Sequence, residues 1–459
     1  MPEEHKSTFN TISVNVGKFH LGEKTVLVPQ MNRIAAHLFA ATFRSFGMRA
    51  KTLETYKGID LAKAHASGKE CYPCLVTMGD ILYFIDKERK RLGDRFHPDD
   101  FIYFLPEAEG PCRFGMYTKY QRLVLDSFLG TGKLRIGAIT SGDGYSLEGL
   151  LDDSRQLDLR KASYFALVVA DVMDRLLWRL RPYEKEPGIM DAFIEKAMHR
   201  MEGVFETYGT MKKFGTILDK LEEIVKTGIT LIDPTIPRKP LVGVVGEVFV
   251  RMHPPSNEDV IRTLEGFGAE VVNASITEWV NFVSYVNFKE AKGIFRRNLK
   301  QRRMKPAKTY LSQTIGYGLD YLYQEFRKNQ VYKRVTSLID LSLDHNMAHL
   351  DRVLTKADLF TFSLKTEPGV CIASILEYIH KGLNGVVNVY PFTCMHSMTV
   401  SAIIKPRMNE YHIPYLDVSC DGTAQPGREA AIRTFLYQVH QHFRRNGGTG
   451  DIQDAPTPK

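Results

Sequence analysis

The order of apolar and amphipathic segments constrains the fold more than any other feature of this sequence. KTVLVPQ (24–30) is a short apolar run, residues 32–46 follow with a helical pattern, and MRAKTL is strand-like again. DFIYFLP (100–106), a helical pattern near 119–129 and LRIGAIT (134–140) repeat this order. Parallel strands need long crossover connections, which are usually helices, so the alternation predicts a parallel sheet.

The second part of the chain restarts the alternation after a helical stretch from about 148 to 228. That stretch carries apolar residues three and four positions apart, as in YFALVVADVMDRLLWRL. Pro234, Pro237 and Pro240 then interrupt the chain, and the apolar run LVGVVGEVFV (241–250) follows. We expect this run to be the first strand of a second sheet.

The rest of the second part continues the alternation of strands and helices. Ser256 is expected to cap a helix that reaches Phe267, and the strand AEVVNA comes next. A second helical stretch covers about 288–357, and the strands GVVNVYP (385–391) and YLDVS (415–419) complete the alternation.

The sequence therefore predicts an α/β protein with two Rossmann-like parallel-sheet domains, which carry helical insertions and face each other across a cleft. Residues 1–150 are expected to form the N-terminal domain and residues 151–235 a helical layer or connector. Residues 236–459 are expected to form the second domain, with its helical insertion at about 288–357. Single hydrophobic cores stop growing beyond ~250 to 300 residues, so a chain of 459 residues should divide in this way.

The composition argues against a membrane protein. No apolar run approaches the ~18 residues that span a bilayer, and MPEEHKSTFN lacks the basic start and apolar stretch of a signal peptide. We therefore expect a cytoplasmic protein. Lys and Arg exceed Asp and Glu by 61 − 53 = 8, with a concentration at Arg296 to Lys308. A solvated helix face is the favoured interpretation of that stretch, and no nucleic-acid partner is expected.

Six cysteines, three in each half, lie where helices are expected to begin or strands to end. They are Cys71, Cys74, Cys112, Cys371, Cys394 and Cys420. In open α/β sheets, ligands converge at the carboxyl ends of the strands. A helix start also favours the thiolate, which is the form that binds metal. Because the cytoplasm is reducing, we interpret all six cysteines as metal ligands or redox groups rather than as disulfide partners.

Several types of thiol site compete for this pattern. A thioredoxin-like dithiol explains CYPC but leaves four cysteines without a role. Structural zinc usually takes two closely spaced cysteine pairs, and the sequence has one such pair. Buried, inert cysteines are a further alternative. Iron-sulfur ligation accepts irregular spacings and is the favoured hypothesis.

Three cysteines in each half is an unusual number for an ordinary cubane, which takes four ligands. Either one iron of each cubane stays open for substrate, or a group that is not protein bridges two cubanes.

Five stretches of the sequence resemble a known family. They are GKECYPCLVTMGD, FLPEAEGPCRFGMY, LVGVVGEVFVR, VNVYPFTCMHS and IPYLDVSCDGTAQPGREAAIRTF. The resemblance is to the acyl-CoA dehydratase activase-related proteins, which are relatives of the 2-hydroxyacyl-CoA dehydratase subunits and of the double-cubane cluster proteins. It covers nearly the whole chain.

The resemblance implies an iron-sulfur cofactor, either a double cubane of two 4Fe-4S units joined by a bridging sulfide or two separate 4Fe-4S clusters. Cys71, Cys74 and Cys112 would then bind one cubane, and the second set of three the other. The family also implies a homodimer and an electron-donating partner, a separate ATP-hydrolysing activase of the sugar kinase, heat-shock chaperone and actin superfamily. The expected activity is that of a partner-driven oxidoreductase that reduces a small-molecule substrate.

Candidate catalytic residues stand beside the cysteines. His396 and Glu107 are candidates for donating or relaying protons, as is Glu109, whereas Asp421 is expected to shape the turn after Cys420. Two other functions remain open. One is a 2-hydroxyacyl-CoA dehydratase-type radical dehydratase, and the other is an electron carrier or scaffold without catalytic activity.

Overall fold

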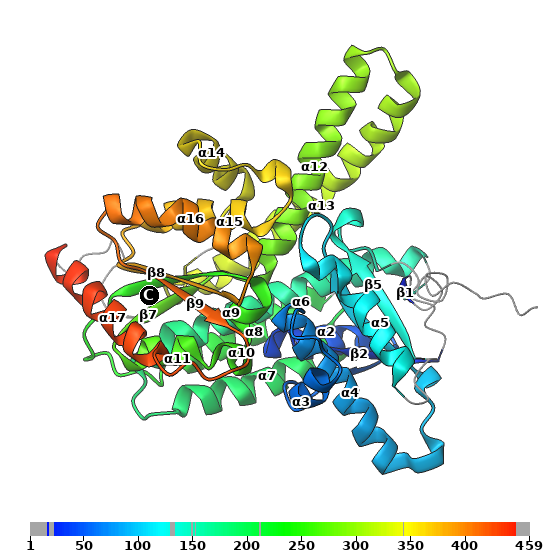
Figure 1. Cartoon of the computed structure of the whole chain (residues 1–459), viewed down its shortest axis with the longest axis horizontal. Helices are drawn as coiled ribbons and strands as arrows, with labels where there is room; N and C mark the ends of the chain where they lie inside the picture. The colour runs from blue at the N-terminus through cyan, green and yellow to red at the C-terminus, as the bar shows by residue number, and fades with distance from the viewer. Residues whose placement is uncertain are drawn as a thin grey trace, which may run out of the picture. The chain divides into compact units, whose positions relative to one another are not determined.

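The computed structural model describes residues 16–17, 23–128, 134–147, 150–151, 153–210, 213–342 and 344–446. It has the predicted α/β class, with two all-parallel sheets of the Rossmann-like kind and helices around them (Figure 1).

The chain divides into two compact units. The first unit contains residues 1–163 and 202–214, and the second contains residues 164–201 and 215–459. The segment 151–235, expected as a separate helical layer, is thus shared between the two units.

The first unit is built on a parallel sheet of order β1-β5-β4-β2-β3. Its strands are β1 (Val16–Gly17), β2 (Thr25–Val28), β3 (Arg49–Thr52), β4 (Phe101–Glu107) and β5 (Arg135–Thr140). Its main helices are α2 (Arg33–Ser45), α3 (Ile59–Ala64), α4 (Tyr72–Leu92) and α5 (Tyr117–Ser127). The bounds of β2, α2, β4, α5 and β5 match the sequence-based ranges closely, whereas β1 and α3 were not expected.

Neighbouring residues of β4 show how helices cover both faces of this sheet. The Tyr103 hydroxyl donates to the Thr77 carbonyl of α4 at 2.8 Å. The Phe104 ring lies against Phe39 and Phe43 of α2, with centroids 5.3 and 6.1 Å apart. Successive side chains of a strand point to opposite faces, so α2 and α4 lie on opposite sides of the sheet.

The second unit is built on a parallel sheet of order β7-β6-β8-β9. Its strands are β6 (Leu241–Gly246), β7 (Glu270–Asn273), β8 (Gly385–Pro391) and β9 (Tyr415–Cys420). Two helices, α15 (Glu367–His380) and α16 (Met395–Glu410), cover one face of it. The other face carries α11 (Val260–Gly266) and α17 (Arg428–Arg445) (Figure 1).

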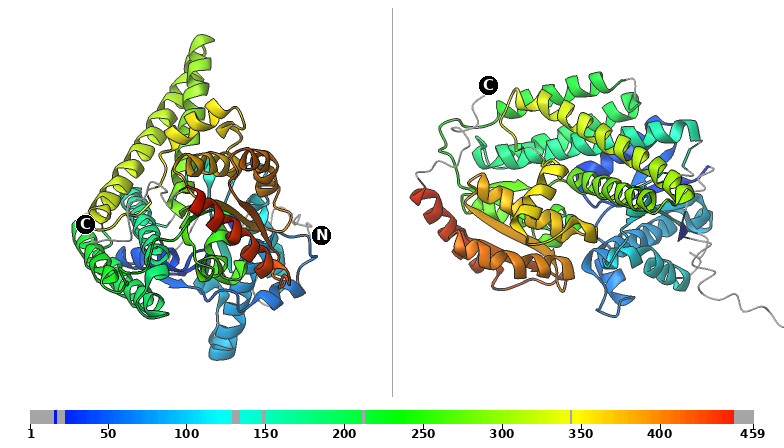
Figure 2. Two further views of the ribbon diagram at one scale, coloured as in Figure 1. Left: turned by 90° about the vertical axis from the view of Figure 1, so that its left-hand side faces the viewer. Right: turned by 90° about the horizontal axis from the view of Figure 1, so that it is seen from above.

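Longer helices complete the molecule. They are α6 (Asp153–Leu180), α7 (Ile189–Tyr208), α8 (Phe214–Ile229), α12 (Ile276–Lys300), α13 (Met304–Thr336) and α14 (Met347–Ala357). The antiparallel pair α12 and α13 forms an arm that extends away from the sheet of the second unit (Figures 1 and 2). The predicted insertion at 288–357 corresponds to this arm and α14, but it begins earlier, at Ile276.

Two predicted elements of the second unit are wrong. The run 241–250 is not one strand, because β6 ends at Gly246 and a short helix, α9 (Val248–Met252), follows. Gly246 has φ +117°, and a Cβ there would lie 2.1 Å from the Val389 carbonyl oxygen, so the strand cannot continue with a side chain at this position. Ser256 does not cap the next helix but lies inside α10 (Pro254–Asn257).

No described helix is long and apolar enough to cross a membrane.

Two glycines test the packing of α3 against α4. A Cβ on Gly79 would lie 2.6 Å from the Gly58 carbonyl oxygen, whereas a Cβ on Gly203 of α7 meets nothing within 4 Å. We expect Gly79→Ala to destabilise the protein by about 1–3 kcal/mol. The control Gly203→Ala should stabilise it by about 0.5–1 kcal/mol, because helix-interior glycine carries an entropic cost. Thermal unfolding measures both, and equal midpoints for the two variants would contradict this packing.

Candidate functional site

The first cysteine set begins at the N-terminus of α4. Cys71 is the N-cap residue, with φ −69° and ψ 136°, and Cys74 is the third residue of the helix. Pro73 stands between them in the first turn, where its missing N–H costs nothing. The two cysteines therefore occupy one helical turn, and the Cys74 N–H donates to the Cys71 carbonyl at 2.9 Å.

Cys112 reaches the same region from the loop after β4. Its sulfur accepts a hydrogen bond from the Phe114 N–H at 3.4 Å, at the start of a short 3-10 helix. The neighbouring Arg113 guanidinium donates to the Lys69 carbonyl at 3.0 Å, two residues before Cys71. This contact joins the Cys112 loop to the segment that leads into α4, so the first three cysteines share one locality of the first unit.

A buried carboxylate supports this locality. Asp80 of α4 accepts from the Thr55 hydroxyl at 2.9 Å and from the Tyr56 N–H at 2.8 Å. The Tyr56 hydroxyl in turn lies 2.8 Å from that of Tyr72, the residue after Cys71. Burial raises the pKa of Asp80 to about 7. Asp80 therefore ties the loop after β3 to the helix that carries Cys71 and Cys74.

The second cysteine set lies at the carboxyl edge of the second sheet. Cys420 is the last residue of β9, and Cys394 is the N-cap residue of α16, three residues after the end of β8. Pro391 pairs with Cys420 across the strands, and the Phe392 N–H donates to the Cys420 carbonyl at 2.8 Å. These contacts bring the two cysteine backbones close together.

Cys371 joins them from the second turn of α15. Its sulfur lies 3.9 Å from the carbonyl oxygen of Gly246, the last residue of β6. Three parallel strands, β6, β8 and β9, thus end beside the second cysteine set, as the sequence predicted for ligands at strand ends.

Two buried carboxylates, Glu247 and Glu367, lie among these cysteines. Glu247 caps α9 by accepting from the Phe249 and Val250 N–H groups at 3.1 and 2.8 Å. Glu367, in the first turn of α15, accepts from the Val248 N–H at 3.0 Å. Burial and the neighbouring Glu247 raise the pKa of Glu367 to about 8, and burial raises that of Glu247. Sequence reasoning missed both residues, although Glu247 follows a strand end as the cysteines do.

The expectation that the start of α4 favours a thiolate is wrong for Cys74, and burial disfavours the thiolate at three cysteines of the second unit as well. Burial raises the pKa of Cys394 to about 11 and the pKa values of Cys371 and Cys420 to about 12. It raises the pKa of Cys74 well above its ordinary range as well. Desolvation is the largest cause of the raised pKa at each of the four, so at neutral pH these thiols keep their protons and a metal would have to displace them.

The distances between candidate ligand atoms bear on whether three cysteines could bind one zinc ion. In a tetrahedral zinc site with Zn–S bonds of ~2.3 Å, sulfurs lie ~3.8 Å apart. Among the described residues, no cysteine belongs to a group of three candidate ligands whose atoms all lie within 4.8 Å of one another. Binding of a single metal ion by three cysteine sulfurs would therefore require these side chains to move.

The other predicted residues have different environments. His396 is buried in the first turn of α16, its Nε2 has no described hydrogen-bond partner, and burial lowers its pKa. The Glu107 carboxylate accepts from the Thr118 hydroxyl at 2.7 Å and from the Lys119 ammonium at 2.6 Å. Asp421 accepts from the Thr423 N–H and hydroxyl, which confirms that it shapes its turn.

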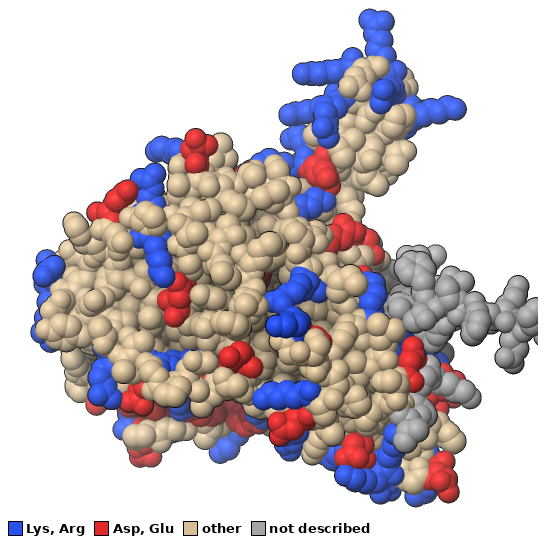
Figure 3. All heavy atoms as spheres, in the orientation of Figure 1, with Lys and Arg blue, Asp and Glu red and all other residues tan. Residues whose placement is uncertain are grey.

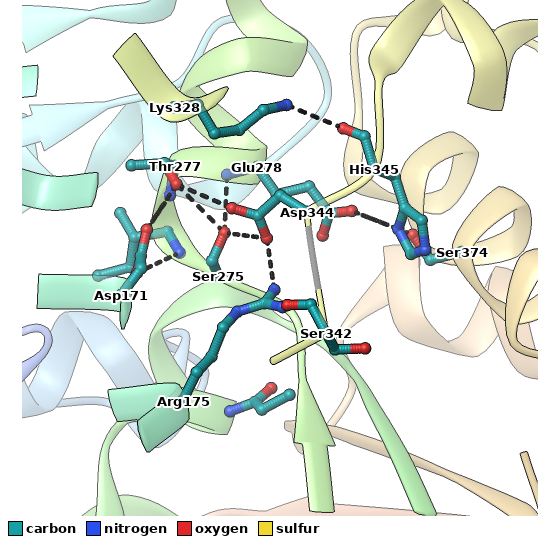
Figure 4. A network of polar contacts seen from close by, with 12 residues as sticks. Asp171, Arg175, Ser275, Thr277, Glu278, Lys328, Ser342, Asp344, His345 and Ser374 are labelled. Atoms are coloured by element: carbon teal, nitrogen blue, oxygen red, sulfur yellow. Dashed lines mark hydrogen bonds and ion pairs between the residues drawn. The ribbon is translucent and has the colours of Figure 1, made fainter. Parts of the chain in front are cut away.

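A buried polar network in the second unit reaches Ser374 of α15, the helix that carries Cys371 (Figure 4). Glu278 of α12 lies 3.1 Å from His345 Nδ1 and accepts from the Ser374 hydroxyl of α15 at 3.3 Å. The Lys328 ammonium of α13 donates to the His345 carbonyl at 3.3 Å. The network therefore connects the root of the arm to α15, where Ser374 lies one turn beyond Cys371.

Two carboxylates of this network have opposite pKa shifts. Burial and the nearby Asp344 raise the pKa of Asp171 to about 7. Burial alone would also raise the pKa of Asp344, but its ion pair with the Arg175 guanidinium lowers it instead. Asp171 accepts from the Thr277 N–H at 2.9 Å and hydroxyl at 2.6 Å and so anchors the start of α12.

No protein-family model and no curated protein matches the chain.

The burial of Asp80 leads to a prediction about how the stability of the protein depends on pH. Its folded pKa of about 7 exceeds the ordinary value of 3.8, so its contribution to stability is full below pH ~4 and is lost as the pH rises through ~7. Asp80→Asn keeps the acceptor for Tyr56 and removes the charge. We expect the variant to gain on the order of 1–2 kcal/mol relative to the parent protein between pH 5 and pH 8.

Thermal unfolding at both pH values measures this gain. Asp86→Asn, a more exposed carboxylate on the same helix, controls for the change in net charge. An Asp80→Asn midpoint that follows the parent at every pH would show that Asp80 carries no buried charge.

Proposed function

We propose that this chain is the iron-sulfur reductase component of a partner-driven oxidoreductase, and that each unit binds one cubane through three cysteines. The observation that carries this proposal is the placement of the thiols. In the first unit the start of α4 provides two of them and the loop after β4 the third, and in the second unit three separate segments provide one each. That placement provides six ligands for iron and leaves none of the chain's cysteines without a role.

The arrangement of the thiols supports a cluster over the other thiol chemistries. A dithiol redox site requires only one close pair, yet the second unit also gathers three cysteines from three segments. A structural zinc site needs sulfurs closer together than these. Bound clusters would supply low-potential single electrons. Their potential depends on nearby charge. The buried carboxylates Glu247 and Glu367 would therefore tune it, as would Arg251, whose guanidinium donates to the Gly246 carbonyl beside Cys371 at 2.7 Å.

Exposed side chains beside Cys394 support electron entry at the second unit. Phe392, Met395 and Met398 are all more than half exposed, on the loop and first turn that carry Cys394. A cluster held by Cys394 would therefore lie near the protein surface, as electron transfer from another protein requires. His396, buried in the same turn with an unpartnered Nε2 among the described atoms, is placed to donate or accept a hydrogen bond there.

The family resemblance supplies the finer form of the proposal. On that basis the two cubanes form a double-cubane cluster, electrons come from a separate ATP-hydrolysing activase, and the reduced compound is a small molecule. A dehydratase-type reaction and a purely electron-carrying role are the alternatives. A substrate-induced change in the cluster spectrum would separate a reductase from a carrier.

Iron analysis tests the proposal. Anaerobically reconstituted protein should contain about eight irons per chain with matching acid-labile sulfide. Cys74→Ser and Cys420→Ser should each remove about half of this iron or more, because each breaks one three-cysteine set. Thr399→Ala is the matched control, since its hydroxyl bonds only to the Met395 carbonyl of its own helix.

Stoichiometric zinc, or no metal after reconstitution, would contradict the proposal. So would full iron content in both cysteine variants. Circular dichroism of the metal-free variants checks that they are folded.

A further inference from the structure

The arm formed by α12 and α13 is firmly rooted in the second unit. The Tyr164 hydroxyl of α6 donates to Asn281 of α12 at 2.7 Å and to the Gln324 carbonyl of α13 at 3.2 Å. The Gln324 amide also donates to the Ser284 hydroxyl at 2.8 Å. These buried bonds hold the two helices together at their base.

The outer part of the arm is exposed. Between Lys292 and Tyr323, a stretch that the structure describes in full, Ala307 is the one buried residue. Its charge is also one-sided, because no Asp or Glu occurs between Ala291 and Leu319. The cations there are Lys292, Arg296, Arg297, Lys300, Arg302, Arg303, Lys305 and Lys308. The number of these cations equals the formal net charge of the whole chain, +8. They form the basic tip of the arm, which is visible in Figure 3.

A stripe of large apolar side chains runs along α13 below this tip. Its members are Leu311, Ile315, Leu319, Leu322 and Phe326, and each is between 41% and 64% exposed. Steps of three and four residues place them on one face of the helix. Over 15 residues this stripe is about 22 Å long.

Leu319 and Leu322 of the stripe face away from α12. Tyr321 and Gln324 face inward, since the Tyr321 ring lies 5.4 Å from that of Tyr285 and Gln324 bonds to Ser284. Leu319 and Leu322 each lie two positions before one of these residues, and two steps turn about 200° round a helix. Leu319 and Leu322 therefore point away from Tyr321 and Gln324, and their exposure shows that α12 leaves them uncovered.

We propose that the arm is a docking site for a partner protein that presents an amphipathic helix with an acidic rim. The apolar face of that helix would cover the stripe, and its carboxylates would pair with the cations of the tip. Nucleic acid would satisfy the cations but leave the stripe in water. A second copy would bring another arm with the same cations. The inference does not depend on which cofactor the cysteines bind.

The root of the arm gives this docking site a structural connection to the cysteine region. Lys328 of α13 and Glu278 of α12 both contact His345, and Glu278 also binds Ser374 of α15. The helices α12 and α13, which would bind the partner, are thus hydrogen-bonded at their base to α15, the helix that carries Cys371.

Fluorescence anisotropy on the full chain tests the docking site. The probe is a labelled Glu- and Leu-rich amphipathic peptide about 20 residues long, which matches the stripe. We expect salt-sensitive binding that weakens at least about tenfold in Leu319→Gln/Leu322→Gln and in Arg302→Glu/Arg303→Glu, because each pair removes one half of the recognition.

Matched controls separate this site from general surface effects. Tyr437→Gln removes an exposed apolar residue of α17, and Lys196→Glu/Lys356→Glu reverses two exposed cations elsewhere. Both should bind as the parent protein does. A scrambled peptide of the same composition should bind at least about tenfold more weakly, since it lacks an apolar face. If Leu319→Gln/Leu322→Gln does not fold, Ile315→Gln replaces it.

Four results would overturn the proposal. They are equal binding of the scrambled peptide, undiminished binding in the variants, tighter binding of duplex RNA or phosphatidylserine vesicles than of the peptide, and a sedimentation-velocity dimer that the stripe variants dissociate. The last result would assign the stripe to a second copy of the chain.

Discussion

Parallel strand pairing is the constraint on which the rest of this structure depends. In each sheet all strands run in one direction, so their carboxyl ends share one edge and the following helices begin beside it. Gly246, Pro391 and Cys420 end three adjacent strands of the second sheet, and the second cysteine set gathers around them. Cys112 follows the end of β4 in the first unit in the same way. The positions of the cysteines thus follow from the parallel topology, although their spacing along the sequence differs between the two halves of the chain.

Burial controls the electrostatics of the cysteine regions. It keeps Cys371, Cys394 and Cys420 as neutral thiols by raising their pKa values, and it raises the pKa of Glu367 beside them. A metal centre bound here would have to displace the protons of these thiols.

Periodicity and turn residues were enough to predict much of the fold. They placed β8 correctly at 385–391 and predicted the helix after Asn32, whose side chain does cap α2. The helix α9 was missed because a buried apolar run has the same composition whether it is a strand or a short helix. The break depends on Gly246, whose close approach to Val389 is a tertiary contact. The Glu247 and Glu367 pair was missed for a related reason, because residues 120 positions apart become neighbours only when β6 and α15 pack together.

Iron Mössbauer spectroscopy of the anaerobically reconstituted full chain identifies the type of site that the iron occupies. We expect the bound iron to be in cubane-type clusters with sulfur ligands, and the cubane signal to fall when a cysteine of either set is replaced by serine. High-spin iron with oxygen or nitrogen ligands, or a cubane signal that is unchanged by substitution in one of the two sets, would contradict this expectation.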